Sequence, residues 1–475
     1  MLLQCISGHG NSGFPEYSRA VCAEHLSFSL AFLTCIALMV LAPSFIPAAP
    51  VVTNVSASQQ PGQTGLVDVY CDLSGGQAPM TVSVLFSSDN GVTWTVVPST
   101  AYLLGNVGAG ISNGANKHIV WNAAADRPGV NWSQARAKVT ATESVAGAIE
   151  MVSVPAGTFT MGRRDDGDDG TYGYMYPDEL PRHQVTLSAY QIGKYEVTNG
   201  QYCDVLNWAL GRGYLKNYGG GAYSGDDVYV TGGLVLLYVS NSHCQIQYSG
   251  GAFTWKSQTG SGGVNYSMEN HPVVYVTWFG AAAFCNWLSE KEGRTPCYNL
   301  STWALMVPYP NGYRLPTEAE WERAAAWDGS KHWIYGFISD TLTGKNRCNY
   351  YDYYGSGTWV NPLELSDYLY TSPVGWFNGV NVSPNGSVQT VNSPSPVGAY
   401  DMSGNVWEWC HEMTDPTGPI SGDRVLRGGS WFIEPQYCRN AYRFRLNPAT
   451  SATYVGFRVV RPNGPAGTEY WQLYR

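Results

Sequence analysis

Apolar and polar residues alternate in short runs through the part of the chain that follows residue 50. In Val67–Leu73 and Thr81–Phe86, apolar residues return at nearly every second position. This period is typical of a strand with one buried face, and the Gly, Ser and Asn clusters between the runs are turn signals. We predict an all-β sandwich over residues 50–146, with the role of a spacer or an adhesive module.

Helical spacing marks three later places. Thr198 with Gln201, and Thr317 with Glu320, form capping boxes in front of helical runs, and Phe279–Glu292 carries an apolar side. Elsewhere the chain offers short β-like pieces separated by glycines. We therefore predict a mixed α+β domain with little regular secondary structure over residues 147–463, followed by a tail, 464–475.

Composition narrows the setting. Charged residues make up 13% of the chain, about half the usual share of roughly 25%, and the chain is rich in Gly, Tyr and Trp. A net charge of -9 with no basic run argues against a nucleic-acid partner. The acidic loop Asp165–Gly170 is interpreted as solvated, with calcium binding as the alternative.

The N-terminal segment points to export. Leu26–Ala42 is an apolar run of signal-peptide length, and small residues follow it, but no positive residues gather in front of it. We interpret residues 1–49 as a signal peptide or a membrane anchor, the chain's one expected membrane contact. Eleven cysteines agree with an extracytoplasmic location, where disulfides form.

A set of motifs then carries a family resemblance. In chain order they are Met151–Gly162, Lys194–Asn199, Tyr313–Glu322, Gly404–Cys410, Arg427–Trp431 and Gly456–Val459. Together they resemble the formylglycine-generating enzyme family, also called sulfatase-modifying factors. The resemblance implies a C-type-lectin-like fold for residues 147–463, and we read the preceding sandwich as immunoglobulin-like or fibronectin-like.

The resemblance also implies calcium. One ligand set would be the side chains of Asp401 and Glu408 with the carbonyls of Gly404 and Val406, and a second would be Asn349, Tyr350, Asp367 and Leu369. Carboxylates and carbonyls on a glycine-containing loop are suitable hard ligands. In the alternative, Asp401 caps a turn and Glu408 pairs with an arginine such as Arg427 or Arg443.

Catalysis in the family resembles that of a copper oxidase whose two cysteines, five residues apart, hold copper(I). The first position is Ile433 here and the second is Cys438, so half of the pair is missing, although Ser430 and Trp407 match other active-site positions. Soft copper(I) is bound by paired thiolates. We expect Cys410 to form a disulfide with Cys438.

Three functional hypotheses follow. The first is a non-catalytic, calcium-stabilised module that binds a protein or peptide ligand, or a glycan. The second is a formylglycine-generating oxidase that uses copper and converts a sulfatase cysteine. The third is a lectin-like recognition protein with hypervariable residues at positions 431–455, which would form the binding face.

Overall fold

The computed structural model describes residues 50–61, 65–75, 80–98, 102–111, 114–129, 135–143, 148–230, 232–353, 355–366, 369–413 and 422–463. The segment predicted to be a signal peptide or anchor, residues 1–49, lies outside these ranges, as do Asp367 and the tail. Within them, no helix is both long and apolar enough to cross a bilayer.

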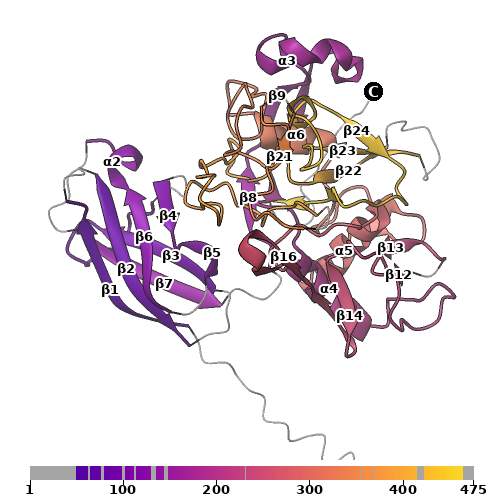
Figure 1. Ribbon diagram of the computed structural model, residues 1–475, viewed down its shortest axis with the longest axis horizontal. Coiled ribbons are helices and arrows are strands. Elements are labelled where there is room, and N and C mark those ends of the chain that lie inside the picture. The colour runs from indigo at the N-terminus through magenta and orange to yellow at the C-terminus, as the bar shows by residue number, and fades with distance from the viewer. Residues whose placement is uncertain are drawn as a thin grey trace, which may run out of the picture. The chain divides into compact units, whose positions relative to one another are not determined.

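In the described residues, the N-terminal part has seven antiparallel strands (Figure 1). They are β1 (Val51–Gln59), β2 (Leu66–Ser74), β3 (Met80–Ser87), β4 (Leu103–Gly105), β5 (Gly108–Ile111), β6 (Gly114–Asn122) and β7 (Arg136–Glu143), with a short helix α2 (Ala123–Asp126) after β6. The sheet orders are β1-β2-β6-β4 and β5-β3-β7. Buried side chains from both sheets share one core, in which Phe86 stacks on Trp121 at 4.3 Å. The predicted sandwich is confirmed, while its immunoglobulin or fibronectin type stays a prediction.

The second part is a mixed α+β structure with many small sheets (Figure 1). Its helices are α3 (Gly167–Tyr172), α4 (Asn199–Gly211), α5 (Trp278–Lys291) and α6 (Glu318–Ala326). Its strands are β8 (Met151–Val154), β9 (Gly157–Met161), β10 (His183–Leu187), β11 (Tyr190–Gly193), β12 (Val228–Tyr229), β13 (Val235–Leu237), β14 (Ile246–Ser249), β15 (Ala252–Trp255), β16 (Ser257–Thr259), β17 (Asn265–Ser267), β18 (Tyr298–Asn299), β19 (Ala304–Leu305), β20 (Tyr351–Asp352), β21 (Thr358–Trp359), β22 (Trp407–Met413), β23 (Arg424–Arg427), β24 (Phe444–Leu446), β25 (Val455–Gly456) and β26 (Val460–Pro462). The predicted fold class is confirmed; the residue boundaries of the domains stay a prediction.

Threonine caps begin the three main helices. Thr198 and Thr317 each accept a bond from the backbone N–H three residues on, and the Gln201 and Glu320 side chains bond back to the cap residue. Thr277 caps α5, so that helix begins one residue earlier than predicted. Each cap satisfies a backbone donor that the first helical turn leaves without a partner.

The sheet that positions the family motifs has the order β24-β23-β22-β25. Glu408 on β22 faces Arg427 on β23 in an antiparallel register, and the Gly456 position of β25 lies parallel on the other side. Three motifs far apart in the sequence therefore meet in one four-stranded sheet.

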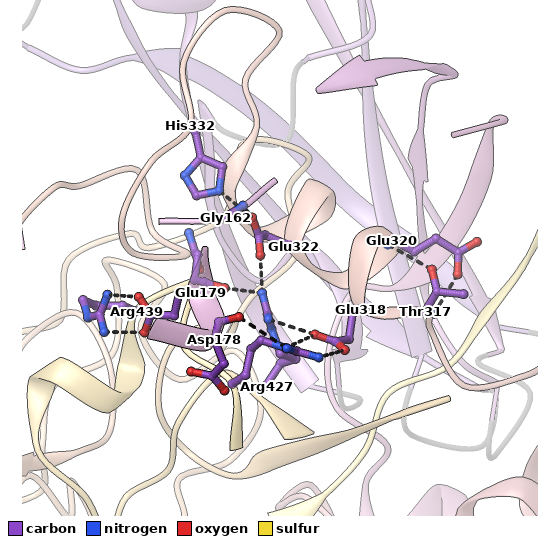
Figure 2. A network of polar contacts seen from close by, with 12 residues as sticks. Gly162, Asp178, Glu179, Thr317, Glu318, Glu320, Glu322, His332, Arg427 and Arg439 are labelled. Atoms are coloured by element: carbon purple, nitrogen blue, oxygen red, sulfur yellow. Dashed lines mark hydrogen bonds and ion pairs between the residues drawn. The ribbon is translucent and has the colours of Figure 1, made fainter. Parts of the chain in front are cut away.

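Buried ion pairs tie loops to this sheet and to α6 (Figure 2). Arg427 bonds to Glu322, whose other oxygen accepts bonds from the Gly162 backbone N–H at 2.6 Å and His332 Nε2 at 2.9 Å. Arg443 makes a two-fold bond to Glu318, with both distances 2.7 Å. Arg427 and Arg443, the partners suggested for Glu408 from the sequence, therefore pair with glutamates of α6 instead.

The acidic loop is not simply solvated. Asp169 is fully buried and accepts a 2.6 Å bond from Arg439, which also pairs with Glu179 at 2.6 and 2.9 Å. Asp168 accepts bonds from the Tyr335 hydroxyl and the Leu342 backbone N–H. Asp165 and Asp166 are exposed, as the solvated interpretation predicted. The interpretation is wrong for Asp168 and Asp169, because their partners lie more than 160 residues away in the chain.

We predict that Thr317→Ala lowers the free energy of unfolding by about 1–2 kcal/mol. The substitution removes the acceptor for the Glu320 backbone N–H at a buried helix start. Urea denaturation measures the change, with the exposed Thr450→Ala as the control. Equal stability of the two variants would contradict the cap.

We predict that acid destabilises the fold through Glu322. Burial opposes its ionisation, but Arg427 and His332 outweigh burial and hold its pKa at about 2, below the ordinary 4.5. The unfolded chain therefore binds more protons between these values, and the stabilisation present above pH 4.5 is lost as pH falls toward 2.

The comparison is between the wild type and Glu322→Gln in urea melts from pH 6 to pH 2.5. The wild type should lose stability over this window with a slope that the variant lacks. Parallel pH profiles would show that Glu322 has an ordinary pKa.

Candidate functional site

The position of the family copper pair holds one thiol, which is packed in an apolar core. Cys438 is fully buried, and burial raises its pKa to about 12. Gly429 has φ +78°, and a Cβ there would lie 2.6 Å from Cys438 Sγ, so the backbone closes over the sulfur. Ile433 is half-buried and packs against a neighbouring core. This donor set does not fit the paired thiolates that copper(I) requires.

The predicted disulfide between Cys410 and Cys438 is wrong. The eight cysteines in the described part of the chain are all buried free thiols. Cys410 packs in the core that contains Trp321 and Val425, whereas Cys438 belongs to a different core with Ile334 and Tyr335. The two cysteines come from neighbouring motifs in the sequence, but their side chains are buried in separate cores.

The thiol that does accompany Cys438 is Cys348, which sequence reasoning missed. Both belong to the same buried core, and burial and then the charge of Cys438 raise the pKa of Cys348. Cys348 comes from a loop between α6 and β20. No local pattern connects it to Cys438.

Ser430 and Trp407 have different contacts. Ser430 is fully buried beside Cys438, and its backbone N–H lowers the pKa of that thiol against the larger effect of burial. Trp407 stacks on Phe444, with ring centroids 5.1 Å apart, and lies 5.8 Å from the Tyr442 ring. Trp407 therefore supports an aromatic surface.

That surface contains a cavity of about 570 Å³, which we call the aromatic pocket. Its lining residues are Tyr176, Pro177, Asp178, Val425, Tyr442, Arg443, Phe444 and Arg445. A second cavity, of about 610 Å³, shares Asp178 and Arg443 with it and reaches the Glu318 and Glu322 ion pairs of Figure 2. No local pattern in the sequence predicts either cavity, because each is lined by residues from several separate segments.

The first predicted calcium set is brought together only in part. Glu408 is fully buried, and both its oxygens bond to Arg458, at 2.6 and 2.7 Å, while Trp321 Nε1 donates a third bond at 2.8 Å. Asp401 accepts a 2.6 Å bond from the Gly375 backbone N–H, and burial raises its pKa. Glu408 thus pairs with an arginine, as in the alternative to calcium binding, but the arginine is Arg458 and not Arg427 or Arg443.

The two predicted calcium sets meet at one place. Gly404 packs so tightly that a Cβ would lie 2.3 Å from the Asn349 carbonyl oxygen, and the Asn405 backbone N–H donates to that oxygen at 2.7 Å. Val406 and Leu369 share a buried core. Tyr350 instead directs its hydroxyl to Gly344 and Asp352.

Glu196 lies at the same place and was missed. It is buried, and its Oε1 accepts a 3.1 Å bond from Asn405 Nδ2. Glu196 Oε2 and Asn349 Oδ1 are buried oxygens with no donor among the described residues. Within the same residues, no three Asp, Glu, His or Cys side chains are arranged around a common metal position. Asp401 is in hydrogen-bonding contact with Glu196. Carboxylate and amide oxygens without donors are ligands of the kind that calcium accepts.

Comparison with known proteins agrees with this architecture. The family described as "Sulfatase-modifying factor enzyme 1-like domain" matches residues 136–463. The formylglycine-generating enzyme of Thermomonospora curvata is 31% identical over 332 residues, which cover 65% of this chain and 92% of the relative. That of Mus musculus is 28% identical over 344 residues, 66% of this chain and 76% of the relative. The crystal structure of CarF aligns with 24% identity and a TM-score of 0.42 over 67% of this chain and 99% of CarF. The chain belongs to the sulfatase-modifying factor family of formylglycine-generating-enzyme-like proteins.

Proposed function

We propose that this protein is an exported, non-catalytic member of its family that binds a protein or peptide ligand and is stabilised by calcium. The proposal rests on the two positions of the copper pair. Ile433 occupies the first position, and Cys438, at the second, is buried beneath the backbone of Gly429. A ligand set that works as a unit loses its function when one member is absent. Glu408 and Arg458, which stand in two of the family motifs, pair with each other and need no catalytic role.

The binding surface is the aromatic pocket, to which the segment 431–455 contributes residues 442–445. The Trp407 ring packs against the rings of Phe444 and Tyr442. The side chain of Arg443 is held by two hydrogen bonds to Glu318. Arg445, by contrast, is exposed. Rigid rings beside guanidinium groups are suited to a peptide that carries acidic and aromatic side chains. A glycan could stack on the same rings.

Burial restricts which residues can vary in a hypervariable recognition protein. Trp431, Cys438 and Arg439 are buried, so substitutions there would damage the core. The exposed positions in the segment are Phe432, Arg445, Asn447, Ala449 and Thr450. Phe432 stacks on Tyr454, and Asn447 Oδ1 accepts the Ala449 backbone N–H. We therefore expect sequence diversity, where it exists, to concentrate on Arg445, Ala449 and Thr450.

The oxidase is the second candidate, because relatives at about 30% identity are named formylglycine-generating enzymes and Cys348 supplies a thiol beside Cys438. Both sulfurs are buried, however, and burial raises both pKa values, which disfavours the thiolate that binds metal. The binding module therefore has the stronger support.

We predict that reduced protein with equimolar copper(I) and oxygen leaves a sulfatase-type cysteine peptide unchanged in mass. Ile433→Cys should gain copper(I) binding, because it restores two thiolates five residues apart. Turnover by the wild type that disappears in Cys438→Ser would contradict the proposal. Turnover that also disappears in Cys348→Ser would assign the second thiol.

We predict that Arg445→Ala weakens peptide binding about ten-fold or more, as expected for loss of a charged contact at an interface. The probe is a random peptide library displayed on phage, selected on the full chain, with affinities of the enriched peptides measured by calorimetry. Arg136→Ala, an exposed arginine on the sandwich, is the matched control. Failure to enrich any peptide, or equal affinity for both variants, would contradict the assigned surface.

A further inference from the structure

Arg424, at the start of β23, is a buried arginine with no carboxylate at ion-pair distance among the described residues. Its side chain is 2% exposed, Nη1 donates to the His411 carbonyl at 2.7 Å, and the guanidinium lies 3.9 Å from the centre of the Trp278 ring. Nε and Nη2 are buried and have no acceptor in the described part of the chain. A buried cation whose donors lack acceptors is costly.

The two donors without acceptors lie on one edge of the guanidinium. Covalent geometry makes the Nε–H and one Nη2–H nearly parallel, which matches the two oxygens of a single carboxylate. Arg443 and Arg458 use these same two nitrogens to bind Glu318 and Glu408, at distances of 2.6–2.7 Å. Arg424 therefore has an edge of the kind that this fold fills with a carboxylate at two other places.

Arg424 also lines a cavity, unlike the other buried arginine that lacks a carboxylate in the described chain. That arginine is Arg323, whose donors without acceptors are Nε and Nη1, which do not share an edge, and it lines neither cavity described above. Arg424 belongs to the lining of the 610 Å³ cavity. We call this the α6 cavity, because α6 contributes Glu318, Ala319 and Glu322 to its wall.

The size and walls of the α6 cavity suit a small amphipathic molecule. Sites for such ligands have volumes of roughly 300–1,000 Å³, largely apolar walls and a few polar groups that fix orientation. Leu180 and Val307 line the cavity and are 41% and 73% exposed, so apolar surface is available to a ligand. Further apolar walls come from Pro181, Val185, Leu305 and Met413.

The five acids that line the α6 cavity are compensated in different ways. Glu179, Glu318 and Glu322 are ion-paired with arginines (Figure 2). Burial and then the charge of Glu318 raise the pKa of Glu412 to about 8, so this acid is mostly protonated at pH 7. Asp178 is exposed to solvent, which screens its charge. At pH 7 these acids therefore leave the charge of Arg424 to a ligand.

We propose that the α6 cavity binds a small amphipathic carboxylate, whose two oxygens accept the Nε and Nη2 bonds of Arg424. The aliphatic or aromatic body of the ligand contacts the apolar walls at Leu305, Val307 and Met413. This site is distinct from the peptide-binding surface proposed above, because Phe444 and Arg445 line the aromatic pocket and not the α6 cavity.

The test is calorimetric titration of octanoate, a carboxylate on an apolar chain, into the full chain at pH 7. The wild type should bind octanoate, and Arg424→Gln should bind it about ten-fold more weakly or worse, because a charged two-donor contact is lost. Arg323→Gln is the matched control and should keep the wild-type affinity. Arg445→Ala should keep it as well, which separates this site from the peptide-binding surface.

Two ligands of similar length distinguish the carboxylate from the chain that carries it. Octanol and octylammonium should both bind more weakly than octanoate. Tighter binding of octylammonium would contradict the proposal and assign the cavity to cations. No binding of octanoate by the wild type, or equal affinity in Arg424→Gln, would overturn the proposal.

A crystal structure of the wild type with octanoate provides the test if Arg424→Gln fails to fold by circular dichroism. The ligand carboxylate should lie within hydrogen-bond distance of Arg424 Nε and Nη2. A carboxylate at any other position would refute the assignment.

Discussion

The second part of this protein depends on buried arginines that each require a carboxylate. Arg314, Arg427, Arg439 and Arg458 are among its largest fully buried side chains, and each is paired. Breaking a buried pair leaves an uncompensated charge, at a cost of about 3–5 kcal/mol. Because helices and sheets here are short, these pairs fix loops that little regular secondary structure would otherwise hold.

This constraint changes what the family motifs mean. Glu408, Glu320 and Arg458 stand in motifs that mark the family, yet their polar atoms are engaged in ion pairs inside the fold. Such residues are retained for as long as the fold is retained. The paired thiolates that the resemblance implies would instead need a cysteine at position 433, where this chain has Ile433.

Local patterns predicted the parts of the structure that local physics determines. The threonine caps at 198 and 317 depend on residues three positions away, and alternation in the N-terminal strands reflects one buried face, so both could be read from the sequence. The motif order similarly identified the fold class. The candidate site was harder, because Glu408 meets Arg458 across 50 residues and Asp169 meets Arg439 across 270.

The missed residues share a physical cause. Nothing in their own segments distinguishes Glu196 and Cys348. Only the packing of distant loops leaves Glu196 Oε2 without a donor and places Cys348 in the same core as Cys438. Trp407 shows the converse, since its motif suggested an active site while its ring supports Phe444 and Tyr442. A scaffold that supports both a sulfur site and an aromatic surface can lose the first and keep the second. Ile433 takes part in none of the buried ion pairs described above, so the residue at position 433 can differ while these pairs stay intact.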